Sequence, residues 1–118
     1  GAGWSGLPGL DRAAAAMRAH PYVVREAGQI DAELMAASPA LVAKVGYEGA
    51  LGVGSSSGVG AFCRIVDGGH RAWGPAGVET VRRWVDPAVA SPALDVLSPT
   101  VVLDGAHRPI GQLRATWS

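Results

Sequence analysis

The stretch LVAKVGYEGALGVGSSSGVGAFCRIVDGG, residues 41–69, decides the fold of this chain. Three of its runs are apolar and suit strands, namely residues 41–45, 50–53 and 59–66. The segments between them are rich in glycine and serine, which favours tight turns. Two consecutive hairpins of this kind predict a three-stranded antiparallel meander.

Helical patterns stand on both sides of the meander. Residues 10–20 (LDRAAAAMRAH) are alanine-rich and end before Pro21, and residues 32–37 follow Asp31, a residue suited to capping a helix. The tail holds two possible short strands, at residues 97–103 and 110–117. The order of elements predicts an α+β fold, an antiparallel β-meander flanked by helices.

A further helix is expected over residues 76–85, with Pro75 in its first turn. Its apolar face should consist of Val78, Val81, Trp84 and Val85. On the opposite side, Glu79 has the spacing to pair with Arg83. Trp84 is therefore predicted to lie in the core.

Length and charge exclude several classes of protein. A chain of 118 residues with a formal net charge of +0 suits one domain and lacks the basic face that nucleic-acid binding needs. No segment approaches the roughly 20 apolar residues of a membrane span, and the sequence does not open on a signal segment. The single cysteine, Cys63, allows no internal disulfide and favours a reducing compartment. We therefore predict a cytoplasmic protein without nucleic-acid or membrane partners.

Lys44 is the only lysine in the chain, and it lies inside an apolar run. Period-2 alternation places Val42, Lys44 and Gly46 on one face of the strand. Burial there would strip water from the ammonium group, which could then act as a general base or hold a nucleophile's hydroxyl. The glycine two residues on would let a ligand approach the backbone. The alternative is an edge lysine whose ammonium reaches water, a common feature of edge strands.

The turn after this strand adds Tyr47 and Glu48. Glu48 could serve as a general acid or orient a substrate amine, and the alternative is a solvated turn carboxylate. The glycine-rich residues 52–60 lie between two strands, so they match neither the dinucleotide nor the phosphate-loop signature. The three histidines and Cys63 match no zinc spacing, and we expect no metal site or cofactor within this chain.

Five ordered blocks of the sequence resemble the type II, or rhizobial-type, L-asparaginase family. The blocks are residues 17–24, 27–35, 42–49, 66–72 and 105–114. The most telling motif is Ala43-Lys44-x-Gly46-x-Glu48-Gly49. The fold of that family is similar to serine β-lactamases and glutaminases. The resemblance therefore implies that residues 1–118 form one segment, the C-terminal half of a larger domain.

The resemblance implies hydrolysis of L-asparagine to aspartate and ammonia by Ser-Lys chemistry. Lys44 would polarise a serine hydroxyl or carry its proton, and that serine would come from a Ser-x-x-Lys helix outside this chain. Gly46, Tyr47 and Glu48 would help to bind substrate, with the backbone N–H near Tyr47 at the oxyanion. The family can bind zinc through upstream residues. The implied partners are the missing N-terminal half, a small amide substrate and, in a homodimer, a second copy.

Departures from the family pattern keep a second hypothesis open. The family usually has arginine, threonine and alanine where Gln29, Ala32 and Tyr47 stand. A chain changed at these positions could be a non-catalytic binding or assembly domain, with Lys44 paired to an acid or exposed. If the chain instead belongs with a catalytic half, the Lys44 face of the sheet should be open and apolar. The third hypothesis is an unrelated α+β interaction module.

Overall fold

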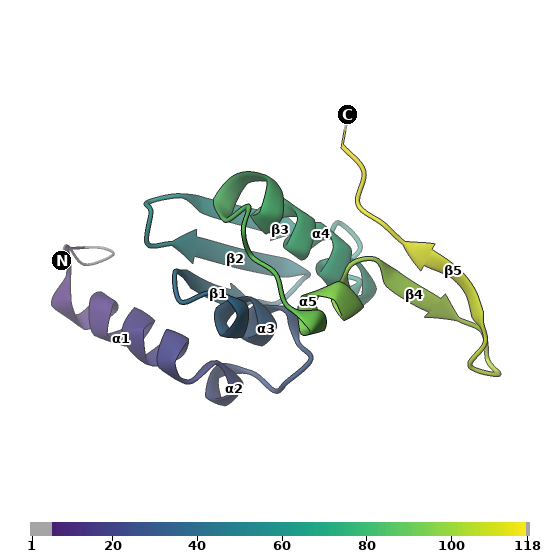
Figure 1. Cartoon of the computed structure of the whole chain (residues 1–118), viewed down its shortest axis with the longest axis horizontal. Helices are drawn as coiled ribbons and strands as arrows, with labels where there is room; N and C mark the ends of the chain where they lie inside the picture. The colour runs from purple at the N-terminus through teal and green to yellow at the C-terminus, as the bar shows by residue number, and fades with distance from the viewer. Residues whose placement is uncertain (1–5, 118) are drawn as a thin grey trace.

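The predicted meander forms the centre of the computed structural model, which describes residues 6–117 (Figure 1). Its strands pair antiparallel in the order β1 (Leu41–Val45), β2 (Ala50–Ser55), β3 (Gly60–Arg64). The register sets Lys44 opposite Gly52, and Gly52 opposite Phe62. The α+β class and the antiparallel sheet flanked by helices are confirmed.

Three helices precede the sheet: α1 (Pro8–Ala19), α2 (Pro21–Val24) and α3 (Ile30–Ala37). The first begins at Pro8, two residues before the predicted start, because the fixed φ of proline suits the first helical position. The prediction that Asp31 caps the third helix is wrong. Gln29 stands at the N-cap position, and Asp31 lies inside α3, where it is fully buried.

The helix predicted for residues 76–85 starts earlier and changes its winding. It comprises η1 (His70–Ala72), α4 (Trp73–Thr80) and η2 (Val81–Val85), and the last of these is a π-helical turn closed by the Asp86 N–H on the Val81 carbonyl. The wider turn rotates Trp84 away from the face that buries Val81 and Val85. Trp84 is 52% exposed, so the prediction that it lies in the core is wrong.

The predicted pair of Glu79 with Arg83 is also replaced. Glu79 lies 3.2 Å from Arg82, which in turn lies 3.1 Å from Asp95. The Arg83 guanidinium instead stacks over the ring of Trp84, at 5.3 Å from its centroid. Either spacing is possible on a helix, and the position of Asp95 favours Arg82.

The proline-rich segment after η2 contains a helix that the sequence analysis missed, α5 (Pro92–Leu97). The Ser91 hydroxyl accepts a hydrogen bond from the Leu94 N–H at 3.2 Å, and Pro92 takes the first helical position. Serine followed by proline is a recognised helix start, so the signal was present in the sequence.

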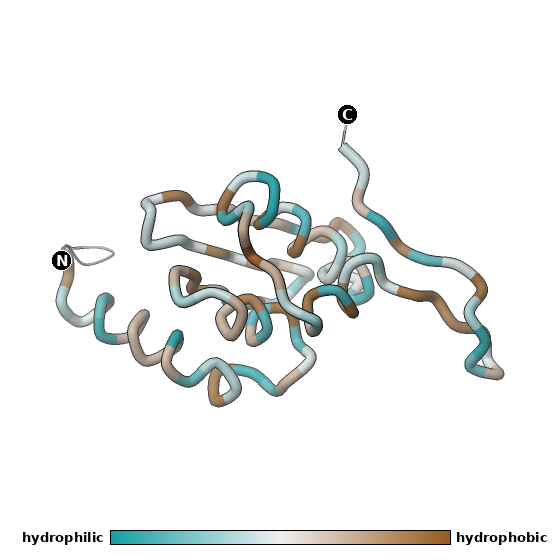
Figure 2. Tube along the Cα trace, viewed as in Figure 1, coloured by the Kyte–Doolittle hydropathy of each residue, from teal (hydrophilic) through white to brown (hydrophobic). Residues whose placement is uncertain are grey.

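The two tail strands pair with each other and not with the meander. β4 (Thr100–Leu103) and β5 (Pro109–Leu113) form a separate antiparallel hairpin. The hairpin projects from one end of the molecule, whose longest axis measures 50 Å (Figure 1). Figure 2 shows hydrophobic residues along β4, and Val101 and Leu103 are each about half exposed.

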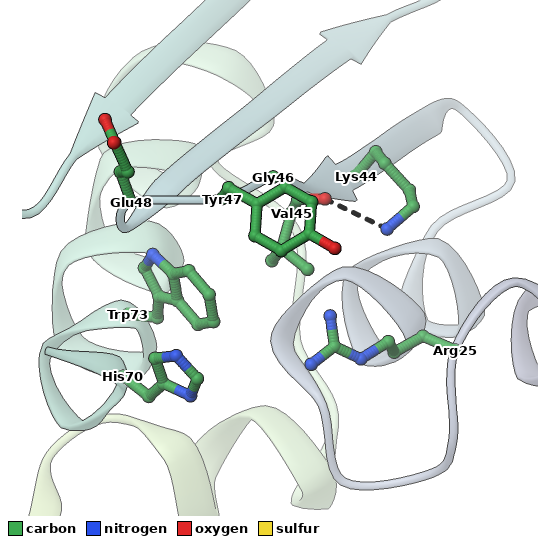
Figure 3. Close-up of a pocket in the computed structure, with 8 residues that line it drawn as sticks. All are labelled: Arg25, Lys44, Val45, Gly46, Tyr47, Glu48, His70 and Trp73. Carbon is green, nitrogen blue, oxygen red and sulfur yellow. Dashed lines mark hydrogen bonds between the residues drawn. The ribbon is translucent and has the colours of Figure 1, made fainter. Parts of the chain in front are cut away.

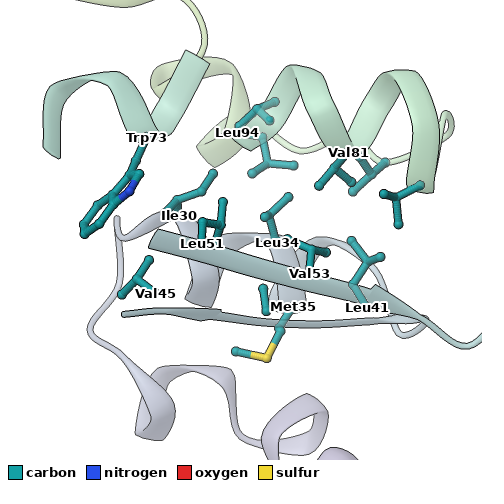
Figure 4. Close-up of a cluster of buried hydrophobic side chains, with 14 residues drawn as sticks. Ile30, Leu34, Met35, Leu41, Val45, Leu51, Val53, Trp73, Val81 and Leu94 are labelled. Carbon is teal, nitrogen blue, oxygen red and sulfur yellow. The ribbon is translucent and has the colours of Figure 1, made fainter. Parts of the chain in front are cut away.

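The hydrophobic core lies on one face of the meander. Leu41, Ala43 and Val45 of β1 point toward it, as do Leu51 and Val53 of β2. Helices α3, α4 and α5, the π-helical turn η2 and Val89 contribute the other side chains of the cluster, among them Leu34, Trp73, Val81 and Leu94 (Figure 4). Alternation along β1 therefore leaves Lys44 on the opposite face, as the period-2 pattern predicts.

Candidate functional site

A hollow of about 420 Å³ opens at the end of β1, where the chain turns toward β2. Figure 3 shows the residues that line it: Arg25, Lys44, Val45, Gly46, Tyr47, Glu48, His70 and Trp73. All four residues singled out from the sequence motif, Lys44 and residues 46–48, lie at this one place. Their chemical roles remain predictions.

Lys44 stands at the wall of the hollow with its ammonium held by two oxygen atoms. Nζ donates a hydrogen bond to the Val45 carbonyl at 2.9 Å and lies 3.7 Å from Asp31 Oδ2. The lysine side chain is 54% exposed, whereas the Asp31 side chain is 0% exposed. The expectation that burial strips water from Lys44 is therefore wrong, since the ammonium lies on the outer face of an edge strand.

Asp31 ties helix α3 to strand β1. Its Oδ2 accepts a hydrogen bond from the Val45 N–H at 3.1 Å, and its Oδ1 accepts one from the Ala32 N–H at 3.1 Å. A carboxylate in the interior needs hydrogen bonds and a nearby cation, and Lys44 is the cation within reach. The two residues form a unit in which a buried anion fixes the position of a solvent-accessible ammonium.

The turn after β1 shapes the rim. Glu48 adopts a positive φ of 60°, a left-handed conformation that few residues other than glycine take. Gly49 also has a positive φ, and a Cβ there would approach the backbone carbonyl oxygen of Ile65 to 2.9 Å, so glycine is required. The resulting tight turn leaves Tyr47 at the rim, 98% exposed. Within residues 6–117 the Tyr47 N–H donates to no protein acceptor.

The Glu48 carboxylate faces away from the hollow (Figure 3). It lies 3.0 Å from the Arg64 guanidinium on β3, in an ion pair whose two side chains are both mostly exposed. Such a surface pair contributes little stability. This arrangement matches the alternative of a solvated turn carboxylate, and it directs the acid group away from Lys44.

The far wall of the hollow is aromatic. His70 stacks on Trp73, with ring centroids 4.6 Å apart and planes 15° from parallel. Trp73 is buried, and its indole Nε1 has no hydrogen-bond partner in the part of the chain that the structure describes. A buried donor without an acceptor is unusual in a folded protein.

Arg25 completes the wall on the side of Lys44. It follows α2 in an extended conformation, which sends the side chain toward the hollow (Figure 3). The residue is half-buried, yet its guanidinium makes no hydrogen bond or ion pair with residues 6–117. Arg25, Asp31 and His70 did not enter the predicted site. A sequence signal existed only for Asp31, which with Glu33 is one of two acids in a helix whose other residues are apolar.

The sheet face that carries Lys44 is left open by the described residues. Gly52 lies opposite Lys44, and a Cβ at Gly52 would meet no atom within 4 Å. Phe62 follows in the same row, with 70% of its surface exposed. The sheet face around Lys44 is therefore open and partly apolar among the described residues.

Neither a metal-binding cluster nor a membrane-spanning helix is found within residues 6–117. Within residues 6–117, no group of three or more His, Cys, Asp or Glu side chains could hold a metal ion, so we assign none of them to a zinc site. Over the same residues, no helix has both the length and the apolar character needed to cross a bilayer.

Comparison with known families identifies the family of the chain. The L-asparaginase II family model matches residues 5–115, almost the whole chain. A search of curated protein sequences finds no significant match. The chain therefore belongs to the L-asparaginase II family, and the hypothesis of an unrelated interaction module is wrong.

Proposed function

We propose that this chain is the C-terminal portion of an amidohydrolase that converts L-asparagine and water to L-aspartate and ammonia. Lys44 is its catalytic residue, and the nucleophilic serine lies outside these 118 residues. Family membership supports the asparaginase-like activity. The single observation that carries the role of Lys44 is its ammonium at the wall of the hollow, beside a wholly buried carboxylate.

The proposed chemistry divides the work between a serine and Lys44. The exposed Lys44 ammonium first loses a proton to solvent, and the resulting amine accepts the hydroxyl proton as the serine oxygen attacks the side-chain amide carbon. That proton then passes to the leaving nitrogen. Ammonia departs, and water then hydrolyses the acyl ester to aspartate. The free N–H of Tyr47 supplies one donor for the oxyanion, whereas the Gly46 N–H already donates to the Ala50 carbonyl at 2.9 Å.

The open sheet face supports a contribution from outside the chain. Within the hollow's lining no serine, threonine or cysteine is present, and the phenol of Tyr47 is the one hydroxyl among the lining residues that the structure describes. The missing half, with a lid over Gly52 and Phe62, would supply the serine and the β-lactamase-like remainder of the sheet. A reducing, cytoplasmic location goes with this proposal.

Ammonia release tests the proposal in two preparations. The isolated chain is expected to release no ammonia from L-asparagine. In the gene product that joins this chain to a Ser-x-x-Lys segment, Lys44→Met should lower kcat by about 10²–10⁴-fold, the range for loss of a proton-transfer group. Arg108→Gln, which removes an exposed cation from the β4–β5 hairpin, is the matched control and should keep full activity. Asparagine hydrolysis that is unchanged by Lys44→Met would overturn the assignment.

One observation favours a second function, a non-catalytic binding or assembly domain derived from the same fold. That hypothesis predicts a Lys44 that is paired with an acid or exposed, and the lysine is both. Sedimentation of the isolated chain distinguishes the two. A stable monomer or symmetric dimer that needs no further polypeptide, with no hydrolysis in the joined protein, would favour the assembly domain.

A further inference from the structure

The unpaired Arg25 makes the hollow a site for an anion. Lys44 shares its charge with Asp31, and the Glu48 carboxylate is paired with Arg64, but the Arg25 guanidinium has no counter-charge among the described residues. It is half-buried, and it faces the same space as the Lys44 ammonium (Figure 3). A partly desolvated guanidinium without an acceptor is a strong binding site for a carboxylate, because its planar fork matches two carboxylate oxygens.

The opposite wall limits the size and shape of the ligand. The stacked rings of His70 and Trp73 offer a flat apolar surface across the hollow from Arg25 and Lys44 (Figure 3). The volume of about 420 Å³ lies at the small end of ligand pockets. A short amino acid can therefore contact Arg25 at one end and the Lys44–Tyr47 corner at the other.

We propose that Arg25 binds the α-carboxylate of a small amino-acid substrate and so determines specificity for free amino acids over derivatives in which that carboxylate is amidated. The identity of the ligand rests on the proposed function, since the amide end is the one that reaches Lys44. The contact with Arg25 itself is argued from the unpaired guanidinium alone. Amino-acid amides, in which the α-carboxylate is replaced by an uncharged amide, should bind poorly.

Calorimetric titration of the full chain tests the proposal, with L-asparagine and L-aspartate as ligands and L-asparaginamide, which has an amide in place of the α-carboxylate, as the comparison ligand. A charged hydrogen-bonded pair corresponds to roughly 10–100-fold in affinity. Arg25→Gln should therefore weaken asparagine binding by about that factor, and Arg25→Lys should recover only part of it because lysine lacks the fork. L-Asparaginamide should bind the wild-type chain as weakly as asparagine binds Arg25→Gln.

Controls separate this inference from the proposed function. Arg108→Gln should bind asparagine like the wild type, and circular dichroism checks that Arg25→Gln remains folded. The indole N–H signal of Trp73 in NMR spectra, assigned with Trp73→Phe, should shift on binding.

Equal affinity of Arg25→Gln and wild type, equal affinity for asparagine and asparaginamide, or no binding up to about 10 mM ligand each overturns the inference. In the joined protein, hydrolysis that is lost with Lys44→Met while Arg25→Gln leaves the KM for asparagine unchanged would overturn this inference alone. Binding that depends on Arg25 without any hydrolysis would overturn the proposed function alone.

Discussion

The Asp31 carboxylate, wholly buried in α3, lies 3.7 Å from the half-exposed ammonium of Lys44 on β1. The same carboxylate oxygen accepts a hydrogen bond from the Val45 N–H, so it fixes both the strand and the lysine that the strand carries. A helix residue thereby sets the position of the residue that the sequence motif singles out.

Removing this carboxylate should destabilise the fold. Asp31→Asn keeps an acceptor for the Val45 N–H but removes the charge, and we expect unfolding to become easier by about 1–3 kcal/mol. Lys44→Met should cost a comparable amount, about 1–3 kcal/mol, because it leaves the buried Asp31 carboxylate without its nearby cation. Urea denaturation of both single variants and the double variant measures their coupling. Strictly additive effects would show that the two side chains do not stabilise each other.

Two glycines should respond in opposite ways to alanine. A Cβ at Gly74, in α4, would collide with the backbone carbonyl oxygen of Leu97, which cannot move without displacing α5. Gly74→Ala should therefore destabilise the protein by about 1–3 kcal/mol or more. Gly52→Ala, whose Cβ meets open space, is the matched control and should leave the thermal midpoint nearly unchanged. Similar midpoints for the two variants would contradict the packing of α4 on α5.

Ionisation of the Tyr22 hydroxyl should lower the stability of the fold at alkaline pH. Burial, followed by the hydrogen bond to Glu33 and the negative charge of Glu33, raises the pKa of Tyr22 above 10.0. A group whose pKa is higher in the folded state stabilises that state at pH values below its unfolded pKa. This stabilisation is lost as the pH rises through the folded pKa. Wild type should therefore lose more stability than Tyr22→Phe above roughly pH 10.

Absorbance titration at alkaline pH measures this directly. The chain has two tyrosines, so Tyr47→Phe leaves Tyr22 as the only chromophore of its kind. Its phenolate should appear at a higher pH in the folded chain than in urea. Coincident titration curves would show that Glu33 and burial do not act on this hydroxyl.

Protonation of Asp104 should lower the stability of the β4–β5 hairpin at acidic pH. The hydrogen bond from the Arg108 backbone N–H is the main cause that lowers the pKa of Asp104 below 3.8, against a smaller opposing effect of desolvation. The Ala106 N–H and the Arg108 guanidinium lower the pKa further. A carboxyl group whose pKa is lower in the folded state stabilises that state at pH values above its unfolded pKa. This stabilisation is lost as the pH falls through the folded pKa.

Hydrogen exchange of the hairpin amides measures the effect of Asp104→Asn. The variant should exchange faster than wild type at neutral pH, and the difference should shrink below roughly pH 4, where the wild-type carboxyl group becomes protonated. Amides of β1 and β2 serve as the internal reference, because the hairpin forms a separate sheet. A difference that persists unchanged in acid would contradict the role of the charge.

The features that were predicted correctly from the sequence depend on residues close together in the chain. Strands β1, β2 and β3 follow from alternation and turn residues, which act over a few positions. The prediction that Trp84 lies in the core failed because a π-helical turn rotates this side chain outward, and such a turn has no local signature in the sequence. Helix α5 was missed although Ser91-Pro92 marks its start.

The sequence by itself determined the meander, the face on which Lys44 lies and the motif that resembles the L-asparaginase family. Those features depend on period-2 alternation and on residues adjacent in the chain. Only the tertiary structure brought Arg25, Asp31 and His70 to Lys44, from three segments separated in sequence. Burial of the apolar faces of α3 and α4 against one side of the sheet is the physical reason, because that packing decides which polar side chains meet at its edge.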